Sequence, residues 1–178
     1  MHTPITINGI GTKYALRPVD DPVFNIGNDN FTIQVWVNFN GTEGEQTLIE
    51  KWAQANPVAG YTLTKLNGDK LRLAIAVAGE TDIDSEPLTI ASGVWHQFCA
   101  RRAETTFDLF FNGSKVATSS ISAAVSPSSN PLLIGVRNGG AHPVKGRIDE
   151  VAFWSRALSD EEVLSLFNNG SGSQIPAQ

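Results

Sequence analysis

Apolar and polar residues alternate along most of the chain, in short runs separated by turn-forming residues. In the run FTIQVWVNF, Phe31, Val35 and Phe39 fall on one face of an extended strand, while Gln34 and Asn38 fall on the other. An alternation with period two is typical of a strand with one face buried and the other in solvent. We therefore expect a half-buried strand over residues 31–39.

Further runs of the same kind predict a protein built mainly of strands. They cover residues 47–52, 60–66, 70–78, 95–102, 106–112, 115–121, 131–137 and 147–155, and residues 5–16 supply one or two more. Asn-Gly pairs lie between several of them, and Asn-Gly supplies the positive φ that tight hairpins need. Many short strands at intervals of about 8–12 residues favour an all-β fold, an antiparallel sandwich of two sheets.

One helix is expected, over residues 159–167. Ser159 is a suitable N-cap, and Glu162 follows three residues later, as in a capping box. The pair Asn169-Gly170 can end the helix. The chain shows no internal repeat and no linker, so we expect one domain over residues 1–170 and a flexible tail over 171–178.

Composition and charge exclude several classes of function. The 178 residues carry a net charge of −5, which argues against a nucleic-acid partner, because such a partner requires a basic surface. No apolar run approaches the roughly 18 residues of a membrane span. The single cysteine, Cys99, excludes an internal disulfide and lies in the apolar run VWHQFCA, where a buried core residue is expected.

Three segments carry a resemblance to a known family. They read GVWHQFCAR (residues 93–101), NGSK (residues 112–115) and GRIDEVAFWSRALSDEE (residues 146–162). In this order and at these separations they resemble the laminin-G-like (concanavalin A-like lectin/glucanase) jelly-roll family. The resemblance runs from about Ile5 to Asn169 and implies a jelly roll. It implies much less about function, because this scaffold carries lectins, adhesion modules, glycosidases and virion proteins.

The acidic run ETDIDSE, from Glu80 to Glu86, is the strongest candidate for catalysis. Retaining glycosidases on this fold use E-x-D-x-E or E-x-D-x-x-E, which sets two carboxyl groups about 5–5.5 Å apart. Here the spacing is E-x-D-x-D-x-E, so Glu86 lies one residue too far along the strand to match either motif. The run also lies where the family has a variable loop or edge strand. We expect a solvated acidic edge. The scattered histidines show no metal spacing and no nucleophile motif is present, so the chain is expected not to be an enzyme.

The resemblance also implies a structural calcium ion. In many relatives the aspartate that matches Asp149 helps to hold this ion, and the early loop with Asp20 and Asp21 would add oxygen ligands. Calcium takes six to eight such oxygens. The alternative is that Asp149 caps a turn or pairs with Arg147 or Arg156.

Trp52 ends an expected strand beside the loop AQANPVAG, and it is the main candidate for ligand contact. An exposed indole can stack on the C–H face of a sugar ring. Nearby loop and strand-end residues can bind the sugar's hydroxyl groups, and loops on a rigid sandwich often carry such sites. The alternative is that Trp52 packs within its loop. The residues that would join Trp52 are Asn56, Tyr61, Asn138 and His142.

Together these features predict a non-catalytic, lectin-like module that binds a glycan. The alternative is a virion, phage-tail or adhesion subunit whose ligand is another protein surface. A glycoside hydrolase is a remote third hypothesis. Homo-oligomer formation is left open. The start MHTPITINGIG lacks the features of a secretory signal. We therefore expect either a domain of a larger secreted protein, acting outside the cell, or a protein of the virion surface.

Overall fold

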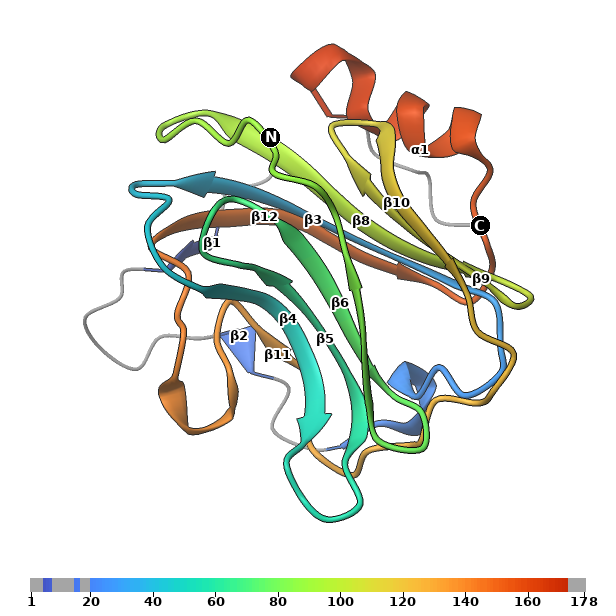
Figure 1. Ribbon diagram of the computed structural model, residues 1–178. Helices are drawn as coiled ribbons and strands as arrows, with labels where there is room; N and C mark the ends of the chain where they lie inside the picture. The colour runs from blue at the N-terminus through green and yellow to red at the C-terminus, as the bar shows by residue number, and fades with distance from the viewer. Residues whose placement is uncertain (1–4, 8–14, 17–19, 173–178) are drawn as a thin grey trace.

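The computed structural model describes residues 5–7, 15–16 and 20–172, which form a sandwich of two antiparallel sheets (Figure 1). The predicted all-β jelly roll is confirmed. The first sheet, here called the helix-covered sheet, has the order β1 (Ile5–Ile7), β12 (Gly146–Trp154), β3 (Phe31–Phe39), β8 (Trp95–Ala103), β9 (Thr106–Phe111) and β10 (Ser114–Ser120). The second, the curved sheet, has the order β2 (Ala15–Leu16), β11 (Leu133–Ile134), β4 (Gln46–Ala53), β5 (Ala59–Lys65), β6 (Leu71–Ala76) and β7 (Glu80–Asp84).

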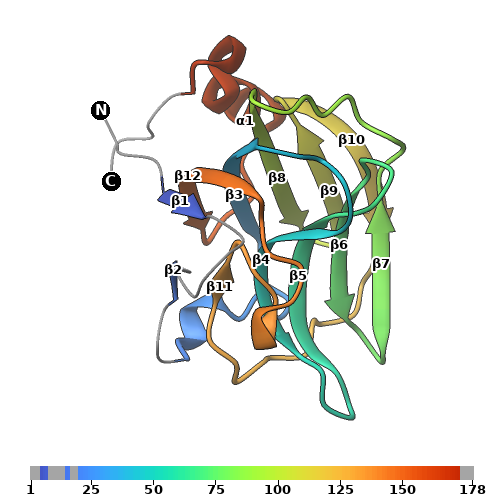
Figure 2. The ribbon, with the colours of Figure 1, turned by 90° about the vertical axis from the view of Figure 1, so that its left-hand side faces the viewer.

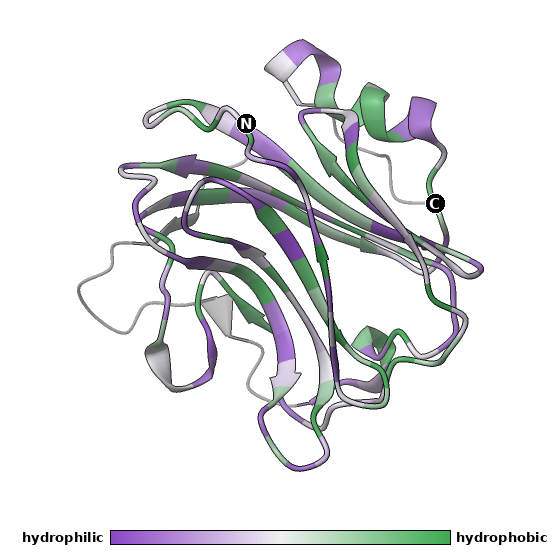
Figure 3. Ribbon diagram, in the orientation of Figure 1, coloured by the Kyte–Doolittle hydropathy of each residue, from purple (hydrophilic) through white to green (hydrophobic). Residues whose placement is uncertain are grey.

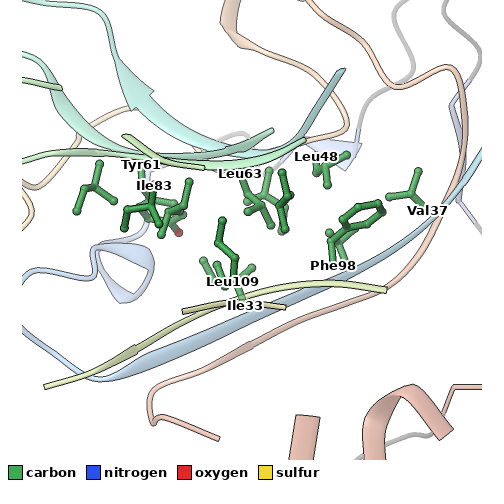
Figure 4. Close-up of a cluster of buried hydrophobic side chains, with 14 of the residues drawn as sticks. Ile33, Val37, Leu48, Tyr61, Leu63, Ile83, Phe98 and Leu109 are labelled. Atoms are coloured by element: carbon green, nitrogen blue, oxygen red, sulfur yellow. The ribbon is translucent and has the colours of Figure 1, made fainter. Parts of the chain in front are cut away.

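The main core lies between the two sheets. Apolar and polar residues alternate along the strands (Figure 3), so each strand turns its apolar face inward. In the close-up of Figure 4, side chains of the two sheets meet in the interior. Those of the helix-covered sheet are Ile33, Val37, Phe98 and Leu109, and those of the curved sheet are Leu48, Tyr61, Leu63 and Ile83.

β3 is buried on both faces, which differs from the half-buried strand that its alternation predicted. Its outward residues Gln34, Trp36 and Asn38 are at most 4% exposed. One cause is α1 (Asp160–Phe167), which packs on the outer face of this sheet through Val163 and Leu166 and stacks Phe167 on Trp36. Asn38 instead donates to the Gly93 carbonyl at 2.9 Å. The buried polar group of Gln34 is satisfied, because Gln97 Nε2 donates to its Oε1 at 2.7 Å.

α1 begins as predicted. The Ser159 hydroxyl accepts from the Glu162 amide at 3.2 Å, and the Glu162 carboxylate accepts from the Ser159 amide at 2.8 Å. The helix ends at Phe167, as expected, because Asn168 takes the left-handed conformation (φ 45°), and η3 (Asn168–Gly170) follows. The tail predicted for residues 171–178 lies outside the described residues beyond position 172. No helix in the described ranges has the length and apolar composition needed to cross a bilayer.

The strands of the curved sheet bend around their outer face, away from the core (Figure 1). The short helix η2 (Asn138–Gly140) lies against that face, as the side view in Figure 2 also shows. A strand was expected over residues 131–137, but β11 has only two residues, because Gly135 turns the chain with φ 77°. The remaining short helix, η1 (Pro22–Phe24), precedes β3.

Candidate functional site

The outer face of the curved sheet has small buried residues in its middle and charged residues at its sides. Leu63 and Leu73 face the core, so the residues next to them in the strands face outward. Thr62 lies opposite Ala74, and Thr64 lies opposite Arg72. Thr62, Thr64 and Ala74 are at most 3% exposed. A ligand on this face would therefore meet the flanking side chains and loops.

One margin of this face is the edge strand β7, whose acids hold an arginine. Arg72 on β6 donates from Nε to Asp84 at 2.7 Å, and its Nη1 lies 2.6 Å from Asp82 Oδ2. Burial raises the pKa of Asp82, Asp84 adds to the rise, and Arg72 opposes it. The acidic run therefore forms an edge strand, as expected, and two of its carboxylates are joined in one ion-pair network.

The other margin is centred on Glu50, which is 1% exposed. Its carboxylate accepts from the Asn138 backbone amide at 2.7 Å and from Arg137 Nε at 3.2 Å. Burial raises the pKa of Glu50, and these two donors oppose the rise. Arg137 also reaches Glu45 at 3.1 Å, and His142 Nδ1 lies 3.9 Å from the same carboxylate. Glu50 therefore fixes the loop that carries two of the predicted ligand residues, Asn138 and His142.

A hollow of about 460 Å³ opens at one end of the curved sheet, between the β4–β5 loop and the β6–β7 turn. We call it the loop-end hollow. Its volume lies within the range typical of ligand sites, about 300–1,000 Å³. Ser126 enters from a third segment, fixed there because its amide donates to Ala76 O at 2.8 Å. The lining residues are Ala55, Asn56, Pro57, Val58, Ala78, Gly79, Glu80 and Ser126.

Three polar side chains of the hollow have no hydrogen-bond or ion-pair partner within the part of the chain that the structure describes. The amide of Asn56 and the carboxylate of Glu80 are both exposed, and the hydroxyl of Ser126 is half-buried. All three are free to bind a ligand. Asn56 was predicted as a ligand residue. Glu80 and Ser126 were not predicted as ligand residues. The acidic run that contains Glu80 was interpreted as a solvated edge, and the segment of Ser126 has no distinctive sequence pattern.

Trp52 is buried, which differs from the exposed aromatic face that the sequence predicted. Its side chain is 5% exposed and packs with Ala74, Ala76 and Val58. Its indole Nε1 donates to Gln54 Oε1 at 3.1 Å. The reason is that the alanines of β6 leave room for the indole on the sheet. Because Val58 also lines the hollow, Trp52 supports the wall of the hollow from behind.

Tyr61 lies on the opposite side of the sheet from the hollow's ligand groups. It faces Lys51 and Ile75 in the register of β5, so its ring points into the core, and it is 1% exposed. Its hydroxyl has no hydrogen-bond partner among the described residues, and burial raises its pKa strongly. The five predicted ligand residues are therefore not brought together: Asn56 lines the hollow, Trp52 lies behind it, Tyr61 is in the core, and Asn138 and His142 belong to the Glu50 margin.

Each of the three predicted calcium ligands has a partner within the protein. Asp20 pairs with the buried Lys51, and Asp21 accepts from the Val23 amide at 3.0 Å. Asp149 accepts from the amide of its neighbour Glu150 at 2.9 Å. It lines a different hollow, of about 240 Å³, with Trp36 and Trp95. In the described part of the chain no three His, Cys, Asp or Glu side chains form a group that could hold a metal ion, and a calcium site completed by backbone oxygens stays a prediction.

His96 and Cys99 are structural, as expected. His96 is 5% exposed, and its ring contacts the Ala91 backbone and the Asn112 amide. Burial lowers its pKa, so the ring is neutral near pH 7. Cys99 is fully buried under α1.

Comparison with known proteins decides the family. The family described as the concanavalin A-like lectin/glucanases superfamily matches residues 11–164. The chain belongs to this superfamily. A search of the curated proteins finds no match.

Several solved structures share the fold. The IT-sialidase CBM40 of Ruminococcus gnavus is 18% identical, with a TM-score of 0.67 over 79% of this chain and 83% of that one. The same module bound to α2,3-sialyllactose is 16% identical, with a TM-score of 0.68 over 92% of this chain and 98% of that one. The binding domain of Paraclostridial Mosquitocidal Protein 1 is 21% identical, with a TM-score of 0.70 over 93% of this chain. This chain covers only 43% of that domain's length, and at these identities the likeness shows the fold alone.

Proposed function

We propose that the chain is a non-catalytic carbohydrate-binding module that holds its ligand in the loop-end hollow. The observation that carries this proposal is the group of three unpartnered polar side chains in one hollow, those of Asn56, Glu80 and Ser126. A sugar presents hydroxyl groups that both donate and accept hydrogen bonds. The amide of Asn56 and the hydroxyl of Ser126 do both, and the carboxylate of Glu80 accepts.

The apolar part of the lining supports the same function. Pro57, Val58 and Ala78 lie among the polar groups, so the hollow offers carbon surface for the C–H faces of a sugar ring. Concave sites with apolar walls and a few fixed polar groups are typical of small-ligand binding. The fold adds support, because the similar CBM40 module is described as bound to sialyllactose.

The acids beside the hollow favour binding over hydrolysis. A glycosidase needs two carboxyl groups, one of them a proton donor or nucleophile at the scissile bond. Asp82 and Asp84 are both held by Arg72, so these two carboxylates serve the ion-pair network of the edge strand. Glu80 is left as the one carboxylate among the described lining residues.

A glycan array followed by calorimetric titration of the best-bound glycan tests the proposal. Asn56→Ala should weaken binding about tenfold, the effect of losing one or two hydrogen bonds. Asn138→Ala is the matched control, because Asn138 is also an exposed loop asparagine, on the Glu50 margin. Both variants should melt like the wild type. An equal loss in both, or a loss only in Asn138→Ala, would place the site elsewhere. If no glycan binds at all, the proposed function fails, and binding to another protein surface becomes the better hypothesis.

A further inference from the structure

The cations near the loop-end hollow are all engaged. Three cationic residues lie in the described strands of the curved sheet: Lys51, Lys65 and Arg72. The two lysines pair with Tyr61 and Leu71 in the register and therefore face the interior. Their side chains are 0% exposed. Lys51 and Lys65 therefore cannot reach a ligand bound on the outer face.

Among the described strand residues of the curved sheet, Arg72 is the cation that faces outward, and nearby carboxylates outnumber its single charge. It is 30% exposed and contacts both Asp82 and Asp84. One guanidinium therefore faces two carboxylates within ion-pair distance. The excess charge on this margin is negative even before Glu80 is counted.

Glu80 places a further negative charge at the hollow itself, and Arg72 attracts it only from beyond ion-pair distance. It begins β7, lies opposite Ala76 and is exposed. Residues two apart on a strand share a face and are about 7 Å apart, so Asp82 and Asp84 continue the negative row away from the hollow. A ligand in the hollow thus meets Glu80 first and finds no free cation among the described residues that line it.

This charge distribution treats neutral and acidic sugars differently. Hydroxyl groups of a neutral sugar can donate to Glu80 in charge-assisted hydrogen bonds, which are stronger than those between neutral groups. A sugar carboxylate or sulfate would face Glu80 without a counter-charge. For two like charges about 6 Å apart at an effective dielectric constant of about 40, the repulsion weakens binding about tenfold.

We propose that the loop-end hollow selects uncharged glycans and rejects acidic ones, with Glu80 as the residue that determines this specificity. The inference rests on the proposed function. It separates this chain from the similar CBM40 module, which is described as bound to sialyllactose, an acidic glycan.

The experiment uses an array in which each neutral glycan is printed beside its sialylated and its sulfated counterparts. The neutral member of each bound pair should bind about tenfold more tightly. Glu80→Gln keeps the size of the side chain and removes its charge, so it should shrink that preference about three- to tenfold. Glu86→Gln is the matched control, since Glu86 is an exposed glutamate that follows the end of β7 and does not line the hollow. It should leave the preference unchanged.

The outcomes separate the two proposals. Equal or tighter binding of the acidic members by the wild type, or a preference that Glu80→Gln leaves unchanged, overturns the specificity while glycan binding stands. Binding of no member of any pair removes the proposed function and the specificity with it. A thermal melt of each variant checks the fold, and Glu80→Gln should melt like the wild type, because the exposed carboxylate makes no hydrogen bond or ion pair with the described residues.

Discussion

Replacing Trp52 with alanine should destabilise the protein without removing a contact to ligand. The sequence alone suggested the opposite, that Trp52 is an exposed stacking platform whose loss weakens binding and spares the fold. In the structure the indole is 5% exposed and packs with Ala74, Ala76 and Val58 on the outer face of the curved sheet. The substitution therefore leaves a cavity next to the loop-end hollow.

The size of the effect follows from the area that the indole buries. A buried tryptophan removes about 200 Å² from water. At about 25 cal/mol per Å² this is about 5 kcal/mol, of which the remaining alanine keeps a part. Large aromatic residues replaced by alanine in protein cores lose about 3–5 kcal/mol, which agrees. For a domain of this size each kcal/mol lowers the Tm by about 2–4 °C, so the Tm should fall by about 6–20 °C.

The assay is urea unfolding of wild type, Trp52→Ala and Trp52→Phe, followed by glycan titration at a temperature where all three are folded. Trp52→Phe keeps a large ring and should lose clearly less stability than Trp52→Ala. Glycan affinity should change less in both variants than in Asn56→Ala. If Trp52→Ala unfolds at the same urea concentration as the wild type but binds glycan tenfold more weakly, the reasoning is refuted and Trp52 contacts the ligand.

Three further predictions concern groups away from the hollow. Cys99 is fully buried and burial raises its pKa to about 12, so a thiol reagent should label it only after denaturation; fast labelling of the native protein would contradict this. Hydrogen bonds from Arg156 and from the Ser159 amide lower the pKa of Glu162 from 4.5 to about 2, so its stabilising contribution is present above pH 4.5 and is lost as the pH falls toward 2. Glu162→Gln should flatten the dependence of Tm on pH in that window, and an unaltered slope would argue against the contribution. The structural calcium ion implied by the resemblance stays a prediction: if Asp149 helps to hold it, calcium should raise the Tm relative to chelator and Asp149→Ala should abolish that rise, whereas equal Tm values for the wild type would refute the ion.

The sequence predicted those features that local signals determine. The strand over residues 31–39 and the capping box at Ser159 appear where expected, because alternation and capping depend on neighbouring residues alone. The burial of both faces of β3 was missed. Whether an outward face is covered depends on α1, which follows more than a hundred residues later.

The ligand residues were harder to predict, since their placement depends on strand register. Trp52 and Tyr61 were grouped as neighbours, but Trp52 pairs with Gly60 and Tyr61 with Lys51, so they point to opposite faces. The alternation in GYTLTK did contain this information, because it sets Tyr61 in line with Leu63 of the core. The part played by Ser126 could not be found this way, because its segment joins the hollow only through contacts with β5 and β6.

The helix on the outer face of β3 also determines where the chain can change over time. Substitutions around Gln34, Cys99 and Phe110 must fit a second packed layer, so few of them will be tolerated. The loops around Asn56 and Ala78 at the other sheet are exposed and carry little of the packing. Variation can accumulate there without loss of the fold. A lineage of such chains can therefore acquire new ligands at one end while the rest of the molecule stays the same.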